Sequence, residues 1–241
     1  MKPQFSRSSL ILGEDAIERL SHKRVAIFGL GGVGGSAVEA LARAGIGEFD
    51  LIDNDCFSIS NLNRQCLSSL NQVGRPKVDV AEERILSINE SALVHKHRCF
   101  FLPQDHGDVD FAQFDYVVDA IDTMSGKLCI IQEAKERGVP VISALGCGNR
   151  LDPSQLKIGD VFETQGDPLA RVLRRELRKS GIKSLKVVYS LEAPKPLLGN
   201  VDEPLPPGKK ALPGSSPFVP PAAGILLAYA VCMDLLSLSK D

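Results

Sequence analysis

The chain has 241 residues, of which 44% are hydrophobic and 24% charged, values that are ordinary for a globular protein with a substantial core. They exclude a disordered, collagen-like or coiled-coil chain and a membrane protein with several spanning helices. The formal net charge of −2 excludes a uniformly basic nucleic-acid binder. We therefore expect no DNA partner, and any RNA contact must come from a local basic patch.

The first 145 residues alternate short apolar runs with amphipathic stretches of helical period. Proline suits the first turn of a helix and glycine its end, so Pro76 predicts a start and Gly138 a stop. Strands that alternate with helices form a mostly parallel sheet with both faces covered, so we predict a Rossmann-like, doubly wound α/β fold. The expected strands are residues 24–28, 48–53, 93–101, 116–121 and 140–144, and the expected helices are residues 33–44, 76–88 and 125–137.

Residues 146–241 have a different texture, which predicts an extension of the same domain. Two apolar runs, residues 156–162 and 185–190, predict strands on either side of one helix. Residues 193–221 are rich in proline and glycine and predict a long crossover loop. The whole chain, residues 1–241, is thus expected to be one domain with a core at residues 1–145.

Residues 222–233 form an unbroken run of 12 small and apolar residues. Twelve residues are too few to span a bilayer, and Pro220, Pro221 and Asp234 end the run. The run predicts a buried helix, with a membrane-associated segment as the alternative. The start of the chain lacks the apolar stretch of a signal peptide, so we expect a cytoplasmic protein.

Gly29-Leu30-Gly31-Gly32-Val33-Gly34 matches the G-x-G-x-x-G pattern between a predicted strand and a predicted helix. Glycines let the backbone approach phosphate oxygens closely, and the N–H groups that begin the helix meet their negative charge. Asp53 follows Gly34 by 19 residues, at the end of the second strand, where a carboxylate accepts hydrogen bonds from ribose hydroxyls. The pattern predicts a nucleotide site; the alternative is that the glycines only allow tight strand–helix packing.

Polar and cationic side chains beyond Asp53 distinguish this site from that of a dehydrogenase. A nucleotidyl transferase must stabilise charge on the α-phosphate and on the departing pyrophosphate, which requires cations and usually a metal. Asn61, Arg64 and Gln65 cluster beyond the carboxyl end of the second strand. Lys77 lies in the first turn of the next helix, where a cation is unfavourable unless it faces an anion. The alternative for Lys77 is a solvated surface position.

Asp119 and Asp122 lie at the end of the strand predicted for residues 116–121, at the edge of the sheet where open α/β folds bind ligands. Asp122 is a candidate ligand of Mg²⁺ or of the nucleotide. Asp119 is expected to cap a helix or to stabilise a turn of the chain. Either carboxylate could instead cap the helix that begins near Ser125.

A basic helix interrupts the nearly neutral chain. Asp167 is a suitable N-cap for it, Pro168 a suitable first residue and Gly181 a suitable residue after its end. Seven basic residues and one acidic residue lie between Arg171 and Lys186. One helical face could follow RNA phosphates, which would make binding salt-dependent; a solvated amphipathic helix and a site for an acidic protein are the alternatives. The candidate RNA-binding residues on that face are Arg171, Arg174, Arg175 and Arg178.

In this order, the motifs GLGGVGG, LIDND, SNLNRQ, VGRPKV and DAID resemble the superfamily of ubiquitin-activating-enzyme-like adenylyltransferases, over roughly residues 7–144. The resemblance implies ATP and Mg²⁺ as cofactors, catalytic roles for Lys77, Arg64 and Asp122, and Asp122 as the metal ligand. It also implies a homodimer in which Arg7 reaches the ATP of the neighbouring subunit. The implied ATP-binding residues are Gly29, Gly31, Gly32, Gly34, Asp53, Asp55, Asn61, Gln65 and Arg7.

The chain departs from the sulfur-carrier branch of that superfamily, which commonly carries two C-x-x-C zinc pairs. Its six cysteines are scattered and form no such pair, so neither a zinc site nor a disulfide framework is expected. Two features, the lack of C-x-x-C pairs and the sequence of residues 211–224, make the chain resemble the branch of tRNA threonylcarbamoyladenosine dehydratases. The cysteines are Cys56, Cys66, Cys99, Cys129, Cys147 and Cys232.

That branch implies an ATP-dependent, ligase-type adenylation of the threonine carboxyl group of the modified adenosine in tRNA. The activated carbonyl then cyclises with loss of AMP. The nearest alternative is adenylation of the C-terminus of a small sulfur-carrier protein, and a sulfur-transfer protein is a further expected partner. A nicotinamide-dependent dehydrogenase and a catalytically silent docking protein are more distant alternatives.

Overall fold

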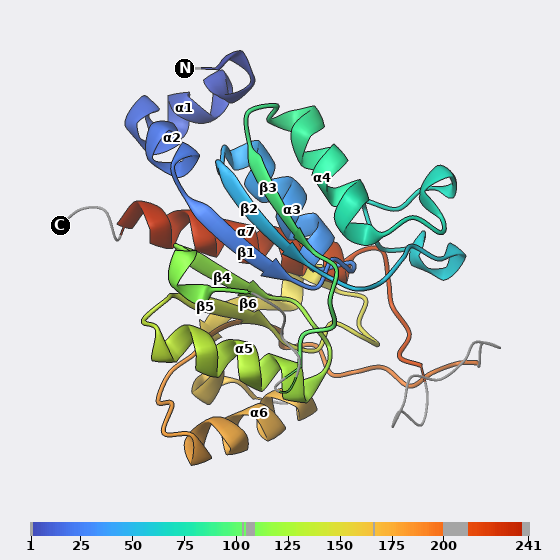
Figure 1. The fold of residues 1–241 in the computed structure, drawn as a ribbon. Coiled ribbons are helices and arrows are strands. Elements are labelled where there is room, and N and C mark those ends of the chain that lie inside the picture. Colours follow the sequence, from blue (N-terminus) through green and yellow to red (C-terminus); the bar gives the residue numbers. More distant parts are fainter. Residues whose placement is uncertain (1, 103, 105–108, 166, 200–211, 238–241) are drawn as a thin grey trace.

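The computed structural model describes residues 2–102, 104, 109–165, 167–199 and 212–237. These residues form three layers, a central sheet with helices on both of its faces (Figure 1). The sheet has seven strands, and only β6 runs antiparallel to its neighbour in the part of the chain that is described. The predicted α/β class with a mostly parallel, doubly wound sheet is therefore confirmed.

The strand order is β3-β2-β1-β4-β5-β7-β6. The chain winds outward from β1 in one direction and from β4 in the other, so the switch point lies between these two strands. Ligands of open α/β sheets bind at the carboxyl ends of the strands beside such a point. The strands are β1 Arg24–Phe28, β2 Glu48–Ile52, β3 Leu93–His97, β4 Tyr116–Asp119, β5 Val141–Ala144, β6 Leu156–Asp160 and β7 Lys186–Ser190.

Two apolar layers make up the core. Val25 and Ile27 of β1 face the layer that contains α3, α4 and α7, whereas Ala26 and Phe28 face the layer that contains α5 and α6. Side chains of a strand alternate between faces, so a strand between two helical layers must be apolar throughout. The helices are α1 Ser6–Leu12, α2 Glu14–Ser21, α3 Gly34–Ala44, α4 Lys77–Ile88, α5 Met124–Glu136, α6 Pro168–Lys179 and α7 Val219–Ser237. Short 3₁₀ turns are η1 Pro3–Phe5, η2 Ile59–Asn61, η3 Leu70–Gln72, η4 Phe111–Gln113, η5 Pro153–Gln155 and η6 Val161–Glu163.

Some predicted strands extend further than the observed ones. β3 stops at His97, which pairs with Ile52, the last residue of β2, so that no partner strand remains beyond it. β6 stops at Asp160, whose Oδ1 accepts a hydrogen bond of 2.8 Å from the N–H of Phe162 and begins η6. In both places the chain leaves the sheet where its neighbour or a local turn takes over the backbone hydrogen bonds.

α7 is the buried helix that the apolar run predicts. It is long and apolar enough to cross a membrane, yet 56% of its most apolar 18-residue window is buried inside the protein. Gly224 approaches α3 so closely that a Cβ there would meet backbone oxygen at 2.2 Å. Near the other end, the Asp234 carboxylate accepts hydrogen bonds of 2.6 Å from Tyr116 and from Lys186. These contacts hold α7 as part of the core.

The crossover loop predicted for residues 193–221 ends earlier in the structure, because α7 begins at Val219. Pro220 and Pro221, predicted to end the apolar run, lie in the first turn of α7, where their missing N–H groups break no helical hydrogen bond. Residues 200–211 of the predicted loop lie outside the described residues.

Candidate functional site

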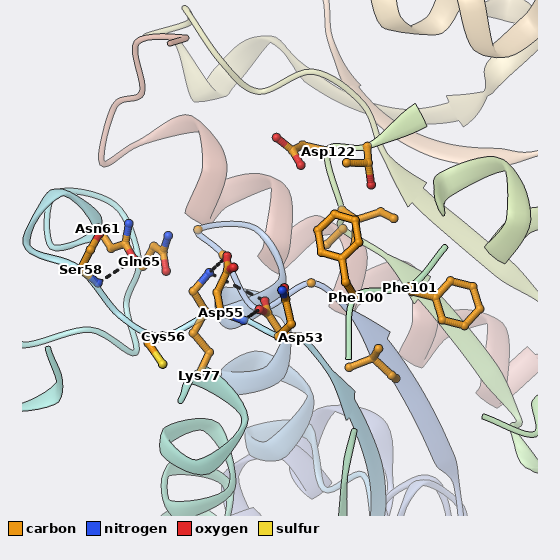
Figure 2. A pocket seen from close by; sticks show the side chains of 18 of the residues that line it. Asp53, Asp55, Cys56, Ser58, Asn61, Gln65, Lys77, Phe100, Phe101 and Asp122 are labelled. Atoms are coloured by element: carbon orange, nitrogen blue, oxygen red, sulfur yellow. Dashed lines mark hydrogen bonds and ion pairs between the residues drawn. The ribbon is translucent and has the colours of Figure 1, made fainter. Parts of the chain in front are cut away.

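A cavity of about 400 Å³ opens at the carboxyl ends of β1, β2 and β4 (Figure 2). The structure brings together at this cavity most of the residues that the sequence nominates for ATP and catalysis, and only Gly34 and Arg7 do not line it. The predicted residues that line it are Gly29, Gly31, Gly32, Asp53, Asp55, Asn61, Arg64, Gln65, Lys77 and Asp122.

The glycines of the loop after β1 have different tasks. Gly29 has a φ of 88°, and a Cβ there would lie 2.9 Å from the carbonyl oxygen of Ala120, the residue after the neighbouring strand β4. A Cβ on Gly34 would lie 1.8 Å from the carbonyl oxygen of Gly29, so Gly34 lets α3 pack on the loop. At Gly31 the nearest atom would be 4.0 Å away, which leaves its backbone open to the cavity. Gly34 is thus required for packing, whereas the backbone at Gly31 is accessible from the cavity.

Asp53 ties this loop to β2. Its two carboxylate oxygens accept hydrogen bonds from the N–H of Leu30, at 2.6 Å, and of Asp55, at 2.8 Å. Burial raises the pKa of the Asp53 carboxyl, and nearby Lys77 opposes that rise. A carboxylate oxygen can accept a second hydrogen bond, so Asp53 can still receive a ribose hydroxyl.

Lys77 is the first residue of α4 and its side chain is buried against carboxylates. Nζ lies 2.9 Å from Oδ2 of Asp55 and 3.8 Å from Oδ2 of Asp53 (Figure 2). The alternative of a solvated surface lysine is therefore wrong. The two carboxylates compensate for a cation at a helix N-terminus, and they hold the ammonium group at the cavity wall.

The segment after Asp55 forms another wall. Asn61 accepts a hydrogen bond from the N–H of Ser58 at 3.1 Å in a capping box around η2. Nη1 of Arg64 donates to the carbonyl oxygen of Ser60 at 2.9 Å. Gln65 is 5% exposed, and within the described residues its Oε1 is buried without a hydrogen-bond partner. Such an acceptor is costly unless a ligand supplies a donor.

Asp119 and Asp122 differ although they are three residues apart. Asp119 is fully buried, and its carboxylate lies 2.6 Å from Nζ of Lys127, which also donates to the carbonyl oxygen of Ala144 at 3.0 Å. Burial raises the pKa of the Asp119 carboxyl, against the attraction of Lys127. Asp122 is exposed and lies across the cavity from Lys77 (Figure 2). The N-cap residue of α5 is Thr123, whose side chain makes no capping hydrogen bond, so neither aspartate occupies the N-cap position of this helix.

One side of the cavity is formed by residues that were not nominated from the sequence. Cys99, Phe100 and Phe101 line an apolar side, where the sequence predicts the end of a strand. Phe101 packs edge-on against Phe28, with ring centroids 4.8 Å apart, whereas Phe100 is 46% exposed. Two adjacent phenylalanines at the end of a predicted strand were the available signal, because an aromatic ring offers a face to a planar base.

Arg7 lies on α1, where its side chain is exposed and lines no part of this cavity. Leu10 and Ile11 on the same helix are also exposed, at 83% and 87%. Within one chain, Arg7 therefore does not join the other predicted residues.

α6 has the predicted caps. Oδ1 of Asp167 accepts hydrogen bonds from the N–H of Leu169 and of Ala170, at 2.8 and 3.1 Å, and Gly181 has a φ of 70°. The prediction that four arginines share an exposed face is wrong for Arg174.

The guanidinium of Arg174 turns inward and donates to the hydroxyl of Thr164 and, at 2.9 Å, to that residue's carbonyl oxygen. The other three arginines are exposed. Arg175 donates to Glu176 at 2.8 Å, and Arg178 lies over the ring of Phe162 at 5.3 Å.

No three metal-ligating side chains gather anywhere in the described ranges. Mg²⁺ needs only one or two protein carboxylates when phosphates and water complete its shell. Asp122, an exposed carboxylate at the cavity, satisfies that requirement.

Three comparisons relate the chain to known proteins. The model of the ThiF family matches residues 5–165. The chain is similar to the tRNA threonylcarbamoyladenosine dehydratase of Bacillus subtilis (strain 168), with 40% identity over 98% of this chain and 96% of that protein. It is similar to that of Haemophilus influenzae, with 39% identity over 68% of this chain and 63% of that protein. Its structure is similar to E. coli tRNA N6-threonylcarbamoyladenosine dehydratase, TcdA, in complex with ATP, with a TM-score of 0.84 and 30% identity over 98% of this chain and 95% of that one.

Proposed function

Because the chain belongs to the ThiF family, we propose that it uses ATP to dehydrate threonylcarbamoyladenosine in tRNA through an acyl-adenylate on the threonine carboxylate. The observation that carries this proposal is the extent of the similarity to the Bacillus subtilis dehydratase, which covers 98% of the chain. The similarity therefore includes α6 and the part of the chain beyond the ATP cavity. A match confined to the cavity would support ATP binding alone.

ATP would occupy the cavity with its phosphates over the open backbone at Gly31 and the start of α3. Asp53 would accept the ribose hydroxyls. Phe100 would lie against the adenine, and the buried Oε1 of Gln65 would receive a donor from the nucleotide. Asp55 and Asn61 would add further polar groups around the nucleotide.

The first step transfers the adenylyl group. A threonine carboxylate oxygen attacks the α-phosphorus, the bond from that phosphorus to the bridging oxygen breaks, and pyrophosphate leaves with the bonding electrons. Negative charge develops on the oxygens around the phosphorus, and Lys77 and Arg64 would stabilise it as preorganised cations. Asp53 and Asp55 hold the Lys77 ammonium at the cavity, so little reorganisation is needed.

Asp122 would hold Mg²⁺ together with phosphate oxygens. When bound, the ion would neutralise part of the phosphate charge. Asp122 lies on the opposite side of the cavity from Lys77, so the two residues would hold the polyphosphate from two directions (Figure 2).

The second step closes the ring. An internal nucleophile of the same modified base attacks the activated carbonyl carbon, the bond from that carbon to the AMP oxygen breaks, and the nucleophile loses a proton. The summed change is loss of one water from the tRNA, with ATP converted to AMP and pyrophosphate. The protein has to supply orientation and charge stabilisation rather than a covalent nucleophile.

The exposed arginines of α6 would bind the tRNA backbone. Arg171, Arg175 and Arg178 are exposed and lie on one helix, which suits phosphates spaced along a strand. Arg174 would instead hold α6 against the 161–164 turn. With a tRNA substrate, we infer a cytoplasmic enzyme.

The active form would be a homodimer with Arg7 supplied to the partner's ATP. Support comes from α1, where exposed Leu10 and Ile11 lie beside exposed Arg7. Mixing the R7A and K77A variants tests this directly. Exchange of subunits should restore activity in mixed dimers, because one site then contains both an intact Lys77 and an intact donated Arg7. A mixture with no more activity than its separate components contradicts the donation.

The experiment for the main proposal combines the protein, ATP, Mg²⁺ and tRNA that bears threonylcarbamoyladenosine. We expect AMP and pyrophosphate in equal amounts and a tRNA mass lowered by one water. The matched control is the same tRNA without the modification, which should yield neither. An unchanged mass with protein that binds ATP contradicts the proposal. Pyrophosphate exchange that depends on a small sulfur-carrier protein and ignores tRNA would indicate the nearest alternative.

A further inference from the structure

A second cavity, of about 510 Å³, adjoins the ATP cavity. The two share a wall that includes the loop after β1, Arg64 and the residues after β4. The rest of the second cavity is lined by the end of β5, the start of α6 and both described limbs of the crossover loop. A ligand in it can therefore extend past the glycine loop to the phosphates of ATP. The shared residues are Gly31, Gly32, Arg64, Ala120, Ile121 and Asp122.

The lining of this cavity suits a mostly apolar body with a few polar groups. Pyrrolidine rings from four segments and two leucines surround it. Pockets of this composition bind the body of a small molecule by burial and fix its orientation with a few polar contacts. These prolines and leucines are Leu145, Pro168, Leu169, Pro194, Pro213 and Pro220.

Arg150 provides the most unusual polar contact. Its side chain is 2% exposed and belongs to the cavity lining. Nε donates to the carbonyl oxygen of Glu192 at 2.9 Å and Nη2 to Asp167 at 3.2 Å, while Nη1 lies 3.3 Å from where a Cβ on Gly146 would stand. Because Asp167 already balances the charge, the remaining donors suit a neutral oxygen such as a ureido carbonyl. A ligand carboxylate would instead reach Arg64 in the shared wall.

The rim of the cavity continues onto the basic helix. Asp167 caps α6 from within the cavity lining, and Pro168 and Leu169 belong to both the cavity and the first turn. Arg171 and Arg175 are exposed on the following turns of the same helix. A nucleoside seated here would have neighbouring phosphates beside cations, which a peptide tail would not need.

We propose that the second cavity is the acceptor site: it holds the modified purine nucleoside whose amino-acid carboxylate is adenylated. The proline-lined part would enclose the base and its ureido group, and the carboxylate would point past Gly31 toward the α-phosphate. The phosphates on either side would lie along Arg171 and Arg175. This assignment rests on the proposed function.

Filling the cavity tests the assignment. Ser215 and Cys147 line it from opposite segments of the chain, and S215W and C147F place aromatic rings there. The matched control is L93W, because Leu93 is exposed on the edge strand β3 and lines neither cavity. For each variant, ATP affinity, the KM for modified tRNA and the binding of free threonylcarbamoyladenosine to the AMP-bound protein are measured.

Both filling variants should raise the KM for tRNA by about tenfold or more and weaken nucleoside binding equally, with ATP affinity changed less than about twofold. L93W should behave as the wild-type protein. Unchanged KM and nucleoside binding in both filling variants overturns the assignment, as does an equal loss of ATP and nucleoside. Preferential binding of a peptide that ends in Gly-Gly also overturns it. If the wild-type protein makes no AMP with modified tRNA, the proposed function itself has failed.

Discussion

The two cavities, proposed above to hold ATP and the acceptor nucleoside and called here the ATP cavity and the acceptor cavity, share a wall but are held in different ways. Around the ATP cavity, the side chains follow the ends of adjacent parallel strands and bond to one another there: Asp53 accepts hydrogen bonds from the loop after β1 and from the residue two positions later. Around the acceptor cavity, segments far apart in the chain meet. The side-chain oxygen of Asn149 accepts a 2.6 Å hydrogen bond from the N–H of Gly214, 65 residues away. The backbone carbonyl oxygen of Asn149 accepts one of 2.7 Å from the backbone N–H of Lys195.

This difference suggests that the sheet-held side performs the chemistry and that the loop-held side positions the substrate. The sheet fixes the ATP side, since its strand ends cannot move without breaking the ladder of hydrogen bonds. A few hydrogen bonds between loops fix the acceptor side, so a single substitution there can loosen one wall. We therefore expect changes on the ATP side to lower kcat and changes on the acceptor side to raise KM.

The K77A variant tests the ATP side most severely. Removing the ammonium group should lower the rate of AMP formation by about 10³-fold, because charge on the transferring phosphorus loses a preorganised cation. ATP binding should weaken by only about tenfold, since the other polar groups remain. Single-turnover release of pyrophosphate and ATP titration separate the two effects. K77R, which keeps the charge but alters its position, should recover part of the rate. A loss of ATP affinity with an unchanged rate at saturating ATP would assign Lys77 to ground-state binding.

The wall between the cavities should depend on Lys127. K127M leaves the Asp119 carboxylate buried without its cation, which should lower the free energy of unfolding by roughly 3 kcal/mol. Urea unfolding measures the change. The double variant K127M/D119L removes both charges and should recover most of the loss, whereas a variant pair that stays equally unstable would show that packing, not charge, is responsible.

The sequence predicts the ATP side well because each residue there follows a strand that its apolar pattern reveals. Asp53 and Lys77 could be placed from strand ends and a helix start alone. The pairing of Asp119 with Lys127 could not be predicted, because nothing in the sequence pattern shows that a lysine within this predicted helix is buried. The same holds for Arg174, which a helical projection places at the border of the polar face while the carbonyl oxygens that it binds come from the 161–164 turn.

The acceptor cavity could not be predicted at all. Arg150 and Asp167 meet across 17 positions, and Asn149 meets Gly214 across 65, with no repeated spacing to connect them. Asp167 was identifiable as a helix cap, but its second contact depends on the fold. Tertiary contacts between loops leave little trace in local sequence patterns.

Two substitutions at Asn149 examine how firmly the acceptor wall is held. Asn149 has a φ of 59°, a conformation that costs most side chains about 1–2 kcal/mol but costs glycine nothing. N149G loses only the side-chain hydrogen bond to Gly214, whereas N149A also acquires backbone strain. N149A should therefore raise the KM for tRNA about tenfold, and N149G about threefold, with kcat little changed. Equal effects of the two would exclude the backbone contribution, and a fall in kcat alone would place Asn149 with the ATP side.

α6 carries exposed arginines and one inward-turned arginine, which can be compared. R171A and R175A each remove an exposed cation, so each should lower the salt slope of tRNA binding by about 1. R174A removes a guanidinium bonded to Thr164 and should lower the melting temperature with the slope unchanged. Binding measured across a range of salt concentrations, beside thermal unfolding, separates the two kinds of arginine. A reduced slope in R174A would mean that its guanidinium turns outward when RNA binds.

The smallest expected effect concerns the rim of the ATP cavity. Cys56 is exposed and lines that cavity, so bound ATP should slow its alkylation by iodoacetamide severalfold. Cys66 lines neither cavity and serves as the internal control. Burial raises the pKa of the Cys232 thiol to about 12, so it should stay unmodified throughout. Peptide mapping by mass spectrometry reads all three sites in one sample. Protection of Cys66 equal to that of Cys56 would indicate that ATP acts through the whole fold, which would undo the separation of a rigid ATP side from a loop-held acceptor side.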